Sequence, residues 1–331
     1  MKKIIVTGGA GFIGSNFIKK IIKNNYEIIN IDNLTYASNY EYIKKYEKNK
    51  NYNFIKLDIN NYSKLSDIIF KFSPDYIINF AAESHVDNSI KDSKNFIRTN
   101  IFGVYNLLRC SHEYLLSKNF KKKFKFIQIS TDEVFGSLGK NVKPKIENSL
   151  LFPSSPYSAS KSSGDLLVNA WNHTYNLPTI VTHCTNNYGP NQHNEKLIPT
   201  IINNALNNKS IPIYGSGKQI RDWIYVDDHC DALIKVIKYG KTGQKYNIGS
   251  NFTTTNLKLA KIICNKIDIL TNKNNSFNQK KINLIKHVSD RPGHDFRYAL
   301  NTNKIYKELN WKSKTDINSG LDQTIKWYIG G

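Results

Sequence analysis

Hydrophobic and polar positions along the first half of the chain form two alternating patterns. Short apolar runs bounded by turn residues are typical of buried strands, and longer stretches with apolar residues three or four positions apart are typical of helices. Strands are predicted at Lys2–Thr7, Glu27–Ile31, Asn53–Leu57, Asp75–Phe80, Phe124–Ser130 and Thr179–Cys184. Helices are predicted between them at Phe12–Lys23, Ser63–Phe72, Asp92–Ser117 and Pro156–Tyr175. Because strand–helix units repeat, we expect an α/β fold with a doubly wound parallel sheet.

The pattern becomes irregular after about Asn187, where loops rich in Gly, Pro and Asn begin. Further elements are predicted at Leu197–Asn207, Val226–Lys238, Lys245–Ile248 and Ile317–Tyr328. We therefore assign residues 1–187 and 220–249 to the sheet domain, and residues 188–219 and 250–331 to a smaller C-terminal lobe. The polar segment 272–281 is expected to be a surface loop, and the segment 137–155 to be loosely held.

The chain has 331 residues and a formal net charge of +21. Its basic residues are mostly lysines spread along the whole length, without interleaved aromatic residues. We therefore expect no nucleic-acid partner, although a positive field would help to recruit an anionic substrate. No apolar run is long enough to span a membrane, so a cytoplasmic protein without a membrane partner is expected.

Cysteine and histidine spacing gives no sign of a metal site. The four cysteines lie far apart, with no CxxC pair, and the histidines form no HExxH motif. The cysteines are Cys110, Cys184, Cys230 and Cys264. This spacing predicts reduced thiols and no bound metal.

A glycine-rich segment directly follows the first predicted strand and opens the first helix. It reads Thr7-Gly8-Gly9-Ala10-Gly11-Phe12-Ile13-Gly14. Glycines let the backbone approach a pyrophosphate closely, and the helix N-terminus offers free N–H groups. Asp32, at the end of the second strand, is placed to bind the ribose hydroxyls of NAD and to repel the extra phosphate of NADP. The domain is therefore predicted to be a Rossmann domain that binds NAD.

Two further motifs carry candidate acid–base chemistry. Tyr157 and Lys161 form a YxxxK pair on one helix face, where the lysine is expected to lower the phenol pKa. Thr131, Asp132 and Glu133 end the fifth strand, where ligands of doubly wound sheets bind. Elimination of water needs a base for a C–H proton and an acid for the leaving hydroxyl, and two carboxyl groups can supply both.

Together these motifs resemble the extended short-chain dehydrogenase/reductases, and in particular the dTDP-glucose 4,6-dehydratase family. The resemblance covers nearly the whole chain and includes the Thr131-Asp132-Glu133 triplet. Further matching stretches are Ala82 to Asp87, Asn186 to Pro190, Glu195 to Pro199, Gln219 to Trp223 and Asp290 to Asp295. The resemblance implies a hydro-lyase that converts a nucleoside-diphosphate glucose to its 4-keto-6-deoxy sugar and water.

The resemblance also implies a role for each candidate catalytic residue. Tyr157 removes the 4-hydroxyl proton while C4 passes hydride to NAD, and Thr131 hydrogen-bonds the C4 oxygen. Glu133 removes the C5 proton, Asp132 protonates the leaving 6-hydroxyl, and the hydride returns to C6. Lys161 holds the nicotinamide ribose and tunes Tyr157.

Candidate binding residues follow from the motif positions and from the resemblance. For NAD they are Gly8, Gly11, Phe12, Ile13, Gly14, Asp32, Asn33, Leu34, Thr35, Asp58, Ile59, Ala81, Ala82, Thr99, Tyr157, Lys161 and Asn187. For the sugar nucleotide they are Ser84, Thr131, Asn186, Lys196, Leu197, Pro212, Tyr214, Arg221, Asn256, Arg291 and His294.

Several alternatives stay open from the sequence. Bacterial members of the family usually have Arg where Asn88 stands, and plant relatives that use UDP-glucose resemble this chain there, so dTDP-glucose and UDP-glucose are both candidate substrates. The alternative enzymes are a UDP-sugar 4-epimerase or decarboxylase, which lack the paired carboxyl groups. A non-catalytic NAD-sensing or nucleic-acid-binding protein would not need Tyr157 and Lys161.

The helices at 92–117 and 156–175 resemble those that pair in dimers of this superfamily, so a homodimer is expected.

Overall fold

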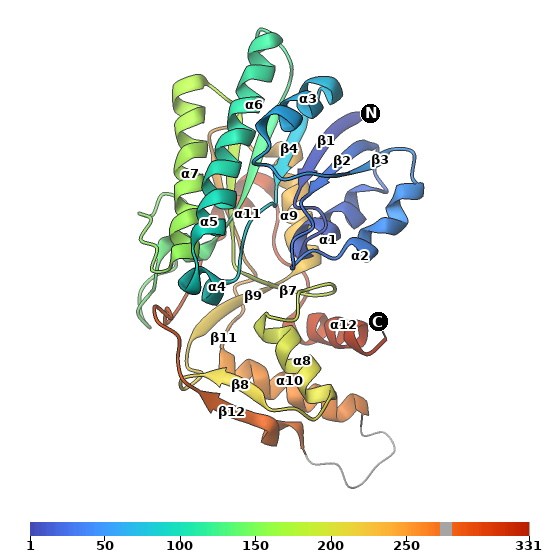
Figure 1. Ribbon diagram of the computed structural model, residues 1–331. Coiled ribbons are helices and arrows are strands. Elements are labelled where there is room, and N and C mark those ends of the chain that lie inside the picture. The colour runs from blue at the N-terminus through green and yellow to red at the C-terminus, as the bar shows by residue number, and fades with distance from the viewer. Residues whose placement is uncertain (272–279, 331) are drawn as a thin grey trace.

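A computed structural model describes residues 1–271 and 280–330 (Figure 1). The surface loop expected at 272–281 therefore lies almost entirely outside the described residues. Within the described part of the chain, no helix is both long and apolar enough to cross a membrane.

The large sheet has seven parallel strands in the described chain, ordered β10-β6-β5-β4-β1-β2-β3 (Figure 1). The strands are β1 Lys2–Thr7, β2 Tyr26–Asp32, β3 Tyr52–Lys56, β4 Tyr76–Asn79, β5 Lys125–Thr131, β6 Thr179–Cys184 and β10 Lys245–Ile248. The order reverses between β1 and β4, which creates the crevice where such sheets bind ligands. The expected α/β class and parallel sheet are confirmed.

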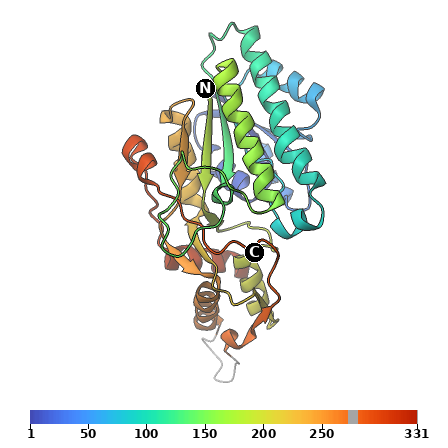
Figure 2. The same ribbon diagram turned by 90° about the vertical axis from the view of Figure 1, so that its left-hand side faces the viewer.

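Helices cover both faces of this sheet because side chains alternate along each strand. Ile4 and Val6 of β1 face a core formed with α1 (Phe12–Ile21), α9 (Val226–Tyr239) and α11 (Asn303–Leu309). Ile5 faces the opposite core, which is formed with three other helices. These are α3 (Tyr62–Phe72), α6 (Val104–Ser117) and α7 (Pro156–Tyr175), of which α6 and α7 lie side by side in Figure 2.

The prediction of one continuous helix at 92–117 is wrong in its first part, because the chain forms several shorter helical segments there. The pieces are α4 Val86–Lys91, α5 Lys94–Ile97, a π-helical turn at Arg98–Gly103, and α6. Asp92 is extended, and its carboxylate accepts the N–H of Lys94 at 2.9 Å, a local bond that competes with a continuous helix. A Cβ on Gly164 of α7 would lie 2.7 Å from the carbonyl oxygen of Asn100. The π turn and α7 therefore touch backbone to backbone.

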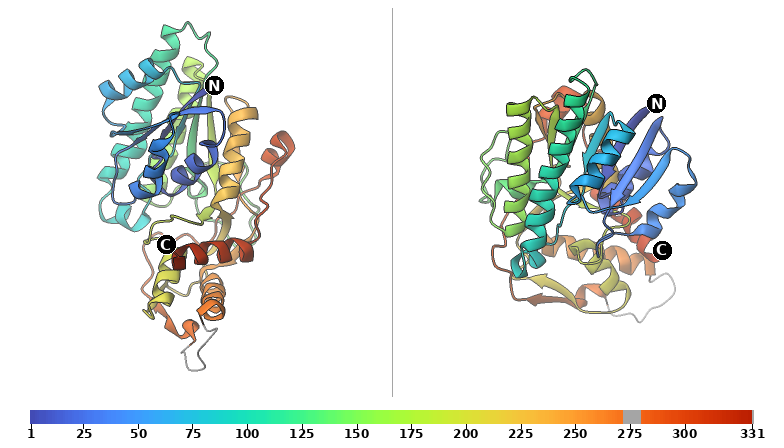
Figure 3. Two further views of the ribbon diagram at one scale, coloured as in Figure 1. Left: turned by 90° about the vertical axis from the view of Figure 1, so that its right-hand side faces the viewer. Right: turned by 45° about the horizontal axis from the view of Figure 1, so that its top comes forward.

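The second lobe lies beyond one end of the large sheet (Figure 3) and contains two small sheets in the described residues. One sheet is ordered β11-β9-β7 and the other pairs β12 with β8. Its elements are β7 Asn186–Tyr188, α8 Leu197–Leu206, β8 Ile211–Tyr214, β9 Ile220–Tyr225, β11 Thr253–Thr255, α10 Asn256–Thr271, the 3-10 turn Lys281–Leu284, β12 Ile285–Val288 and α12 Ile317–Gly330. They enclose a separate core of mostly Ile and Leu side chains.

The division between the two parts differs from the one expected from the sequence. β9, expected in the sheet domain, pairs instead with β7 and β11. Conversely, α11 was expected in the lobe but packs against β10 and α9 of the sheet domain. Both differences arise because a strand or helix joins whichever core its apolar face can reach, and local pattern does not specify that core.

The segment 137–155, expected to be loose, is attached to the chain around 297–301. Leu138 donates to the carbonyl of Arg297 at 2.9 Å, and Lys145 donates to the carbonyl of Ala299 at 2.9 Å. The Phe152 N–H also donates to the carbonyl of Val134, at 2.9 Å. Backbone bonds therefore attach this segment near both ends, and its movement on substrate binding stays a prediction.

Candidate active site

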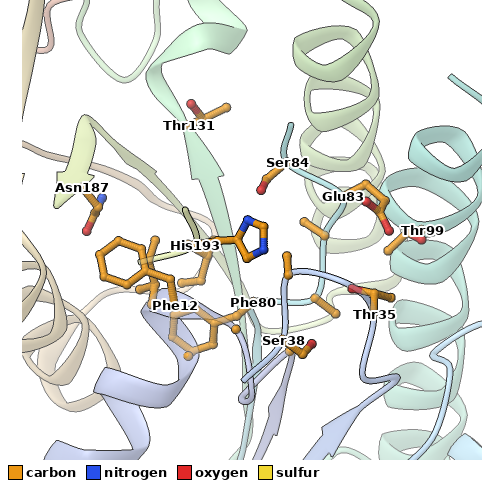
Figure 4. A pocket seen from close by; sticks show the side chains of 18 of the residues that line it. Phe12, Thr35, Ser38, Phe80, Glu83, Ser84, Thr99, Thr131, Asn187 and His193 are labelled. Atoms are coloured by element: carbon orange, nitrogen blue, oxygen red, sulfur yellow. The ribbon is translucent and has the colours of Figure 1, made fainter. Parts of the chain in front are cut away.

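A cleft of about 300 Å³ runs along the carboxyl ends of β1, β2, β4 and β5 and continues to the second lobe (Figure 4). This is the edge at which the strand order reverses, where doubly wound sheets place their ligands. The sequence-predicted residues that line it are Gly8, Gly11, Phe12, Ile13, Gly14, Asp32, Asn33, Thr35, Asp58, Ile59, Ala81, Ala82, Ser84, Thr99, Thr131, Asp132, Glu133, Tyr157, Lys161, Asn186, Asn187 and Lys196. The structure thus brings most of the candidates into one cavity.

The glycine segment forms a tight turn between β1 and α1. Gly8 has φ +72, and a Cβ there would lie 2.5 Å from the backbone nitrogen of Ala81. A Cβ on Gly14 would lie 2.4 Å from the carbonyl oxygen of Gly8. Only glycine fits at these two positions, so the backbone at the start of α1 stays open to a ligand. This cradle fits the pyrophosphate of a dinucleotide, which helix N-termini favour.

Asp32 is buried at the end of β2 and organises the loops around this cradle. Its carboxylate accepts the N–H of Ala10 at 2.8 Å and the N–H of Leu34 at 2.8 Å. It also accepts the hydroxyl of Ser38 at 2.9 Å. Asp32 therefore lines the cleft and also fixes the glycine turn relative to the loop that follows β2.

Tyr157 and Lys161 lie one turn apart on the buried face of α7, which begins at a capping box formed by Ser155 and Ser158. The Lys161 ammonium donates to the carbonyl of Ile129 at 2.7 Å. Burial lowers the pKa of Lys161, and the Asp165 carboxylate opposes this effect.

The expected lowering of the Tyr157 pKa is not found in the protein alone. Burial raises the pKa of Tyr157 well above its ordinary value, and the Glu133 carboxylate raises it further. The hydroxyl of Thr131 opposes the shift. The Lys161 ammonium donates to the Ile129 carbonyl in this arrangement.

Asp132 and Glu133 begin a 3-10 turn that Thr131 caps by accepting the Glu133 N–H at 3.3 Å. Burial raises the pKa of Asp132 well above its ordinary value, and the adjacent Glu133 raises it further. Burial also raises the pKa of Glu133, but Arg291, Arg221 and Lys196 oppose the shift. Both pKa values are therefore raised, but the proton is held more firmly on Asp132 than on Glu133, so the pair can supply an acid and a base.

Among the described residues, some predicted residues do not line the cleft. They are Leu34, Leu197, Pro212, Tyr214, Arg221, Asn256, Arg291 and His294. Arg221 is buried; it donates to the carbonyl of Asp295 at 2.9 Å and lies over the ring of Tyr298. Arg291 contacts Asp87 at 3.2 Å. Both arginines therefore lie outside the cleft lining, and their charges act on Glu133.

Other cleft residues were not among the predicted site residues. They include Ala37, Ser38, Phe80, Glu83, Ser130, Cys184, Thr185, Gln192, His193 and Glu195. Glu83 and Glu195 lie inside the stretches that carry the family resemblance, which was the available signal. His193 has no such signal, yet it lies between Ser84 on one side and Phe12 and Phe80 on the other (Figure 4).

Fold and site together define an extended short-chain dehydrogenase/reductase that acts on a sugar nucleotide. A family model described as GDP-mannose 4,6 dehydratase matches residues 5–324. A dTDP-glucose 4,6-dehydratase from Haemophilus influenzae is 46% identical over 99% of this chain and 98% of its own length.

Two crystal structures named as dTDP-glucose 4,6-dehydratase are also similar. One, from Bacillus anthracis in complex with NAD, is 42% identical with a TM-score of 0.86, covering 100% of this chain and 97% of its own. The other, from Streptomyces venezuelae with NAD bound, is 36% identical with a TM-score of 0.91, covering 99% of this chain and 97% of its own. The chain belongs to the dTDP-glucose 4,6-dehydratase family.

Proposed function

We propose that the protein is an NAD-dependent hydro-lyase that converts dTDP-glucose to dTDP-4-keto-6-deoxyglucose and water. The observation that carries the proposal is the pair of buried carboxyl groups Asp132 and Glu133 in one cleft, where three cations oppose the raised pKa of Glu133 alone. A 4-epimerase needs neither group, because it breaks no C–O bond. Full-length relatives at 46% identity bear the same activity in their names.

The cleft fits NAD in its glycine cradle and at Asp32. When bound there, NAD supplies the redox chemistry by accepting hydride from C4 of the sugar and returning it to C6. The carboxylate of Asp32 disfavours the added phosphate of NADP. Denaturing the purified protein should release NAD, and stoichiometric NADP would contradict this part of the proposal.

The side chains at the end of β5 and on α7 divide the proton transfers among them. Tyr157 takes the proton of the 4-hydroxyl, and Thr131 orients the C4 oxygen. The resulting ketone acidifies the C5 proton, which Glu133 removes and then returns to C5 when the hydride is added at C6. Asp132 donates its proton to the leaving 6-hydroxyl, which departs as water. Each such transfer is typically worth about 10²–10⁴ in rate.

We propose that the substrate diphosphate binds near Lys196, which lines the cleft and donates to the Ser84 carbonyl at 2.7 Å. Arg291 and Arg221 add positive potential, and both lower the pKa of Glu133. The sugar diphosphate is the same in dTDP-glucose and UDP-glucose, so we propose that both are turned over.

We also propose a homodimer built on the face formed by α5, the π turn, α6 and α7. Apolar side chains are exposed there: Phe102 is 58% exposed, Leu166 58%, Ile97 43% and Tyr175 43%. These helices lie side by side on one surface (Figure 2). Light scattering should give the mass of two chains, and Leu166→Glu should shift it toward one. A wild-type monomer at micromolar concentration would contradict the proposal.

Incubation with dTDP-glucose tests the main proposal directly. Mass spectrometry should find a product lighter than the substrate by one water, and Tyr157→Phe should not form it. A product of unchanged mass would identify an epimerase instead. If the protein alters neither dTDP-glucose nor UDP-glucose, both the dehydratase and the epimerase activity are contradicted.

A further inference from the structure

The loop between β7 and α8, residues 189–196, crosses the cofactor cleft; we call it the strap. Near its beginning, Asn191 is buried and bonds to two parts of the sheet domain. Its amide donates to the hydroxyl of Ser15 in α1 at 2.8 Å. Its side-chain oxygen accepts from the amide of Asn39, beyond β2, at 2.7 Å. This end of the strap is thereby attached beside the glycine cradle.

The other end of the strap is attached across the cleft. Lys196 donates to the carbonyl of Ser84, in the segment that follows β4, at 2.7 Å. β1 and β4 are neighbours in the sheet, at the point where the strand order reverses. The strap therefore spans the crevice from one side of this point to the other, and four of its residues, Gln192, His193, Glu195 and Lys196, line the cleft.

Between these two attachment points, His193 makes a further contact with the sheet domain. Its ring meets the ring of Tyr36 edge to face, with centroids 5.6 Å apart. Tyr36 belongs to the loop after β2, so this contact joins the two lobes. Glu195 lies 3.6 Å from one nitrogen of His193 and 3.8 Å from a nitrogen of His85. One oxygen of Glu195 is buried without a hydrogen-bond partner among the described residues, 4.0 Å from the Lys196 ammonium.

We propose that the strap, through Asn191, His193 and their partners Tyr36 and Asn39, retains the dinucleotide by holding the cleft closed over it. This inference rests on the proposed function, because a reaction that starts and ends with NAD gains nothing from releasing it between turnovers. Release requires the strap to separate from the sheet domain, so the bonds that attach the strap set the release rate.

The test uses the purified holoenzyme and isotopically labelled NAD, without any sugar nucleotide. The exchange rate of bound for labelled NAD is followed by mass spectrometry of the protein-bound nucleotide. Asn191→Gly removes both side-chain bonds and keeps a residue suited to φ +66. Loss of two hydrogen bonds should speed exchange at least about tenfold. Tyr36→Ala and His193→Ala should also speed it, whereas His193→Phe, which keeps the ring contact, should restore slow exchange.

The matched control is Asn194→Ala. Asn194 is an exposed strap residue whose amide oxygen accepts from Asn203 of α8 at 2.8 Å, and it does not line the cleft. The Asn194→Ala variant should exchange NAD at the wild-type rate. Wild-type exchange in Asn191→Gly and His193→Ala, with unchanged melting temperatures, would overturn the proposal. If one variant does not fold, the other and Tyr36→Ala decide the outcome. Because exchange is measured without substrate, failure to dehydrate dTDP-glucose would reject the proposed function and leave this test intact.

Discussion

Asp132 and Glu133 are adjacent in the chain and both are buried, yet the charged groups around their two carboxyl groups differ. Burial raises the pKa of Asp132, Glu133 and Asp222 raise it further, and Arg221 opposes the shift; one oxygen of Asp132 has no hydrogen-bond partner in the described part of the chain. Burial also raises the pKa of Glu133, but three cations, Arg291, Arg221 and Lys196, oppose the shift there. A carboxyl group beside anions holds its proton, and one beside cations loses it. Asp132 therefore holds its proton more firmly than Glu133 does.

Glu133→Gln should separate oxidation from elimination. The variant keeps Tyr157 and Thr131, so C4 can still be oxidised, but the C5 proton stays in place. Reduced cofactor should accumulate in a single turnover, seen by its near-ultraviolet absorbance, while product formation falls about 10²–10⁴-fold. Tyr157→Phe is the matched comparison and should give no reduced cofactor. Equal absence of the signal in both variants would contradict this assignment of roles.

Lys161→Met should move the pH dependence of kcat/KM upward. Tyr157 acts as a base only after losing its proton, and burial already raises its pKa. Removing the Lys161 charge disfavours the phenolate further, so the rise in rate with pH should shift by at least about one unit to higher pH. The control is Ser163→Ala, a change at a half-buried residue of the same helix that does not line the cleft. An unchanged profile in Lys161→Met would argue that the lysine serves binding alone.

Gly164→Ala should loosen the contact between α7 and the π turn. The added Cβ would lie 2.7 Å from the Asn100 carbonyl oxygen, which cannot move without the turn. Overpacking of this kind costs about 1–3 kcal/mol in the free energy of unfolding. Thr99 lies in the same turn and lines the cleft, so NAD affinity should also fall. Urea unfolding measures the change in stability, and NAD titration measures the change in affinity. A variant as stable as the wild type would contradict the prediction, because the π turn would then shift at little cost.

His229→Gln should reduce the loss of stability at acid pH. His229 is fully buried, contacts the amide oxygen of Asn187 at 2.8 Å, and burial lowers its pKa to about 3. Because the folded-state pKa is below the ordinary value of about 6.5, its stabilising effect is complete above pH 6.5 and is lost as pH falls toward 3. Between pH 6 and 5 the wild type should lose up to about 1.4 kcal/mol more than the variant. Urea unfolding at both pH values measures this difference, and parallel losses would contradict it.

The two pyrimidine nucleotides should be used with similar efficiency. Thymine and uracil differ by one methyl group, which is worth about 1 kcal/mol in an apolar pocket. We expect kcat/KM for dTDP-glucose and UDP-glucose to agree within about tenfold, and GDP-glucose to be a poor substrate because of its larger base. A preference of about a hundredfold between the pyrimidines would mean that a further contact excludes one of them.

The sequence by itself determined the parallel sheet, the glycine turn and the order of the candidate catalytic residues. Strand β6 and helix α7 have the predicted bounds, and Tyr157, Lys161, Asp132 and Glu133 all line the cleft. These features are local, because they follow from apolar periodicity, from glycine spacing and from the rule that parallel strands end at one edge of the sheet.

Only the tertiary structure decided which neighbours act on those residues. It turned Lys161 toward the Ile129 carbonyl and placed Arg221 outside the cleft lining. It also brought His193 against Tyr36, more than 150 positions away in the chain. Such contacts depend on how two separate cores pack, and short-range patterns do not encode that packing. The pKa values of the site depend on these distant neighbours, so the residue types are fixed by the sequence and their protonation by the fold.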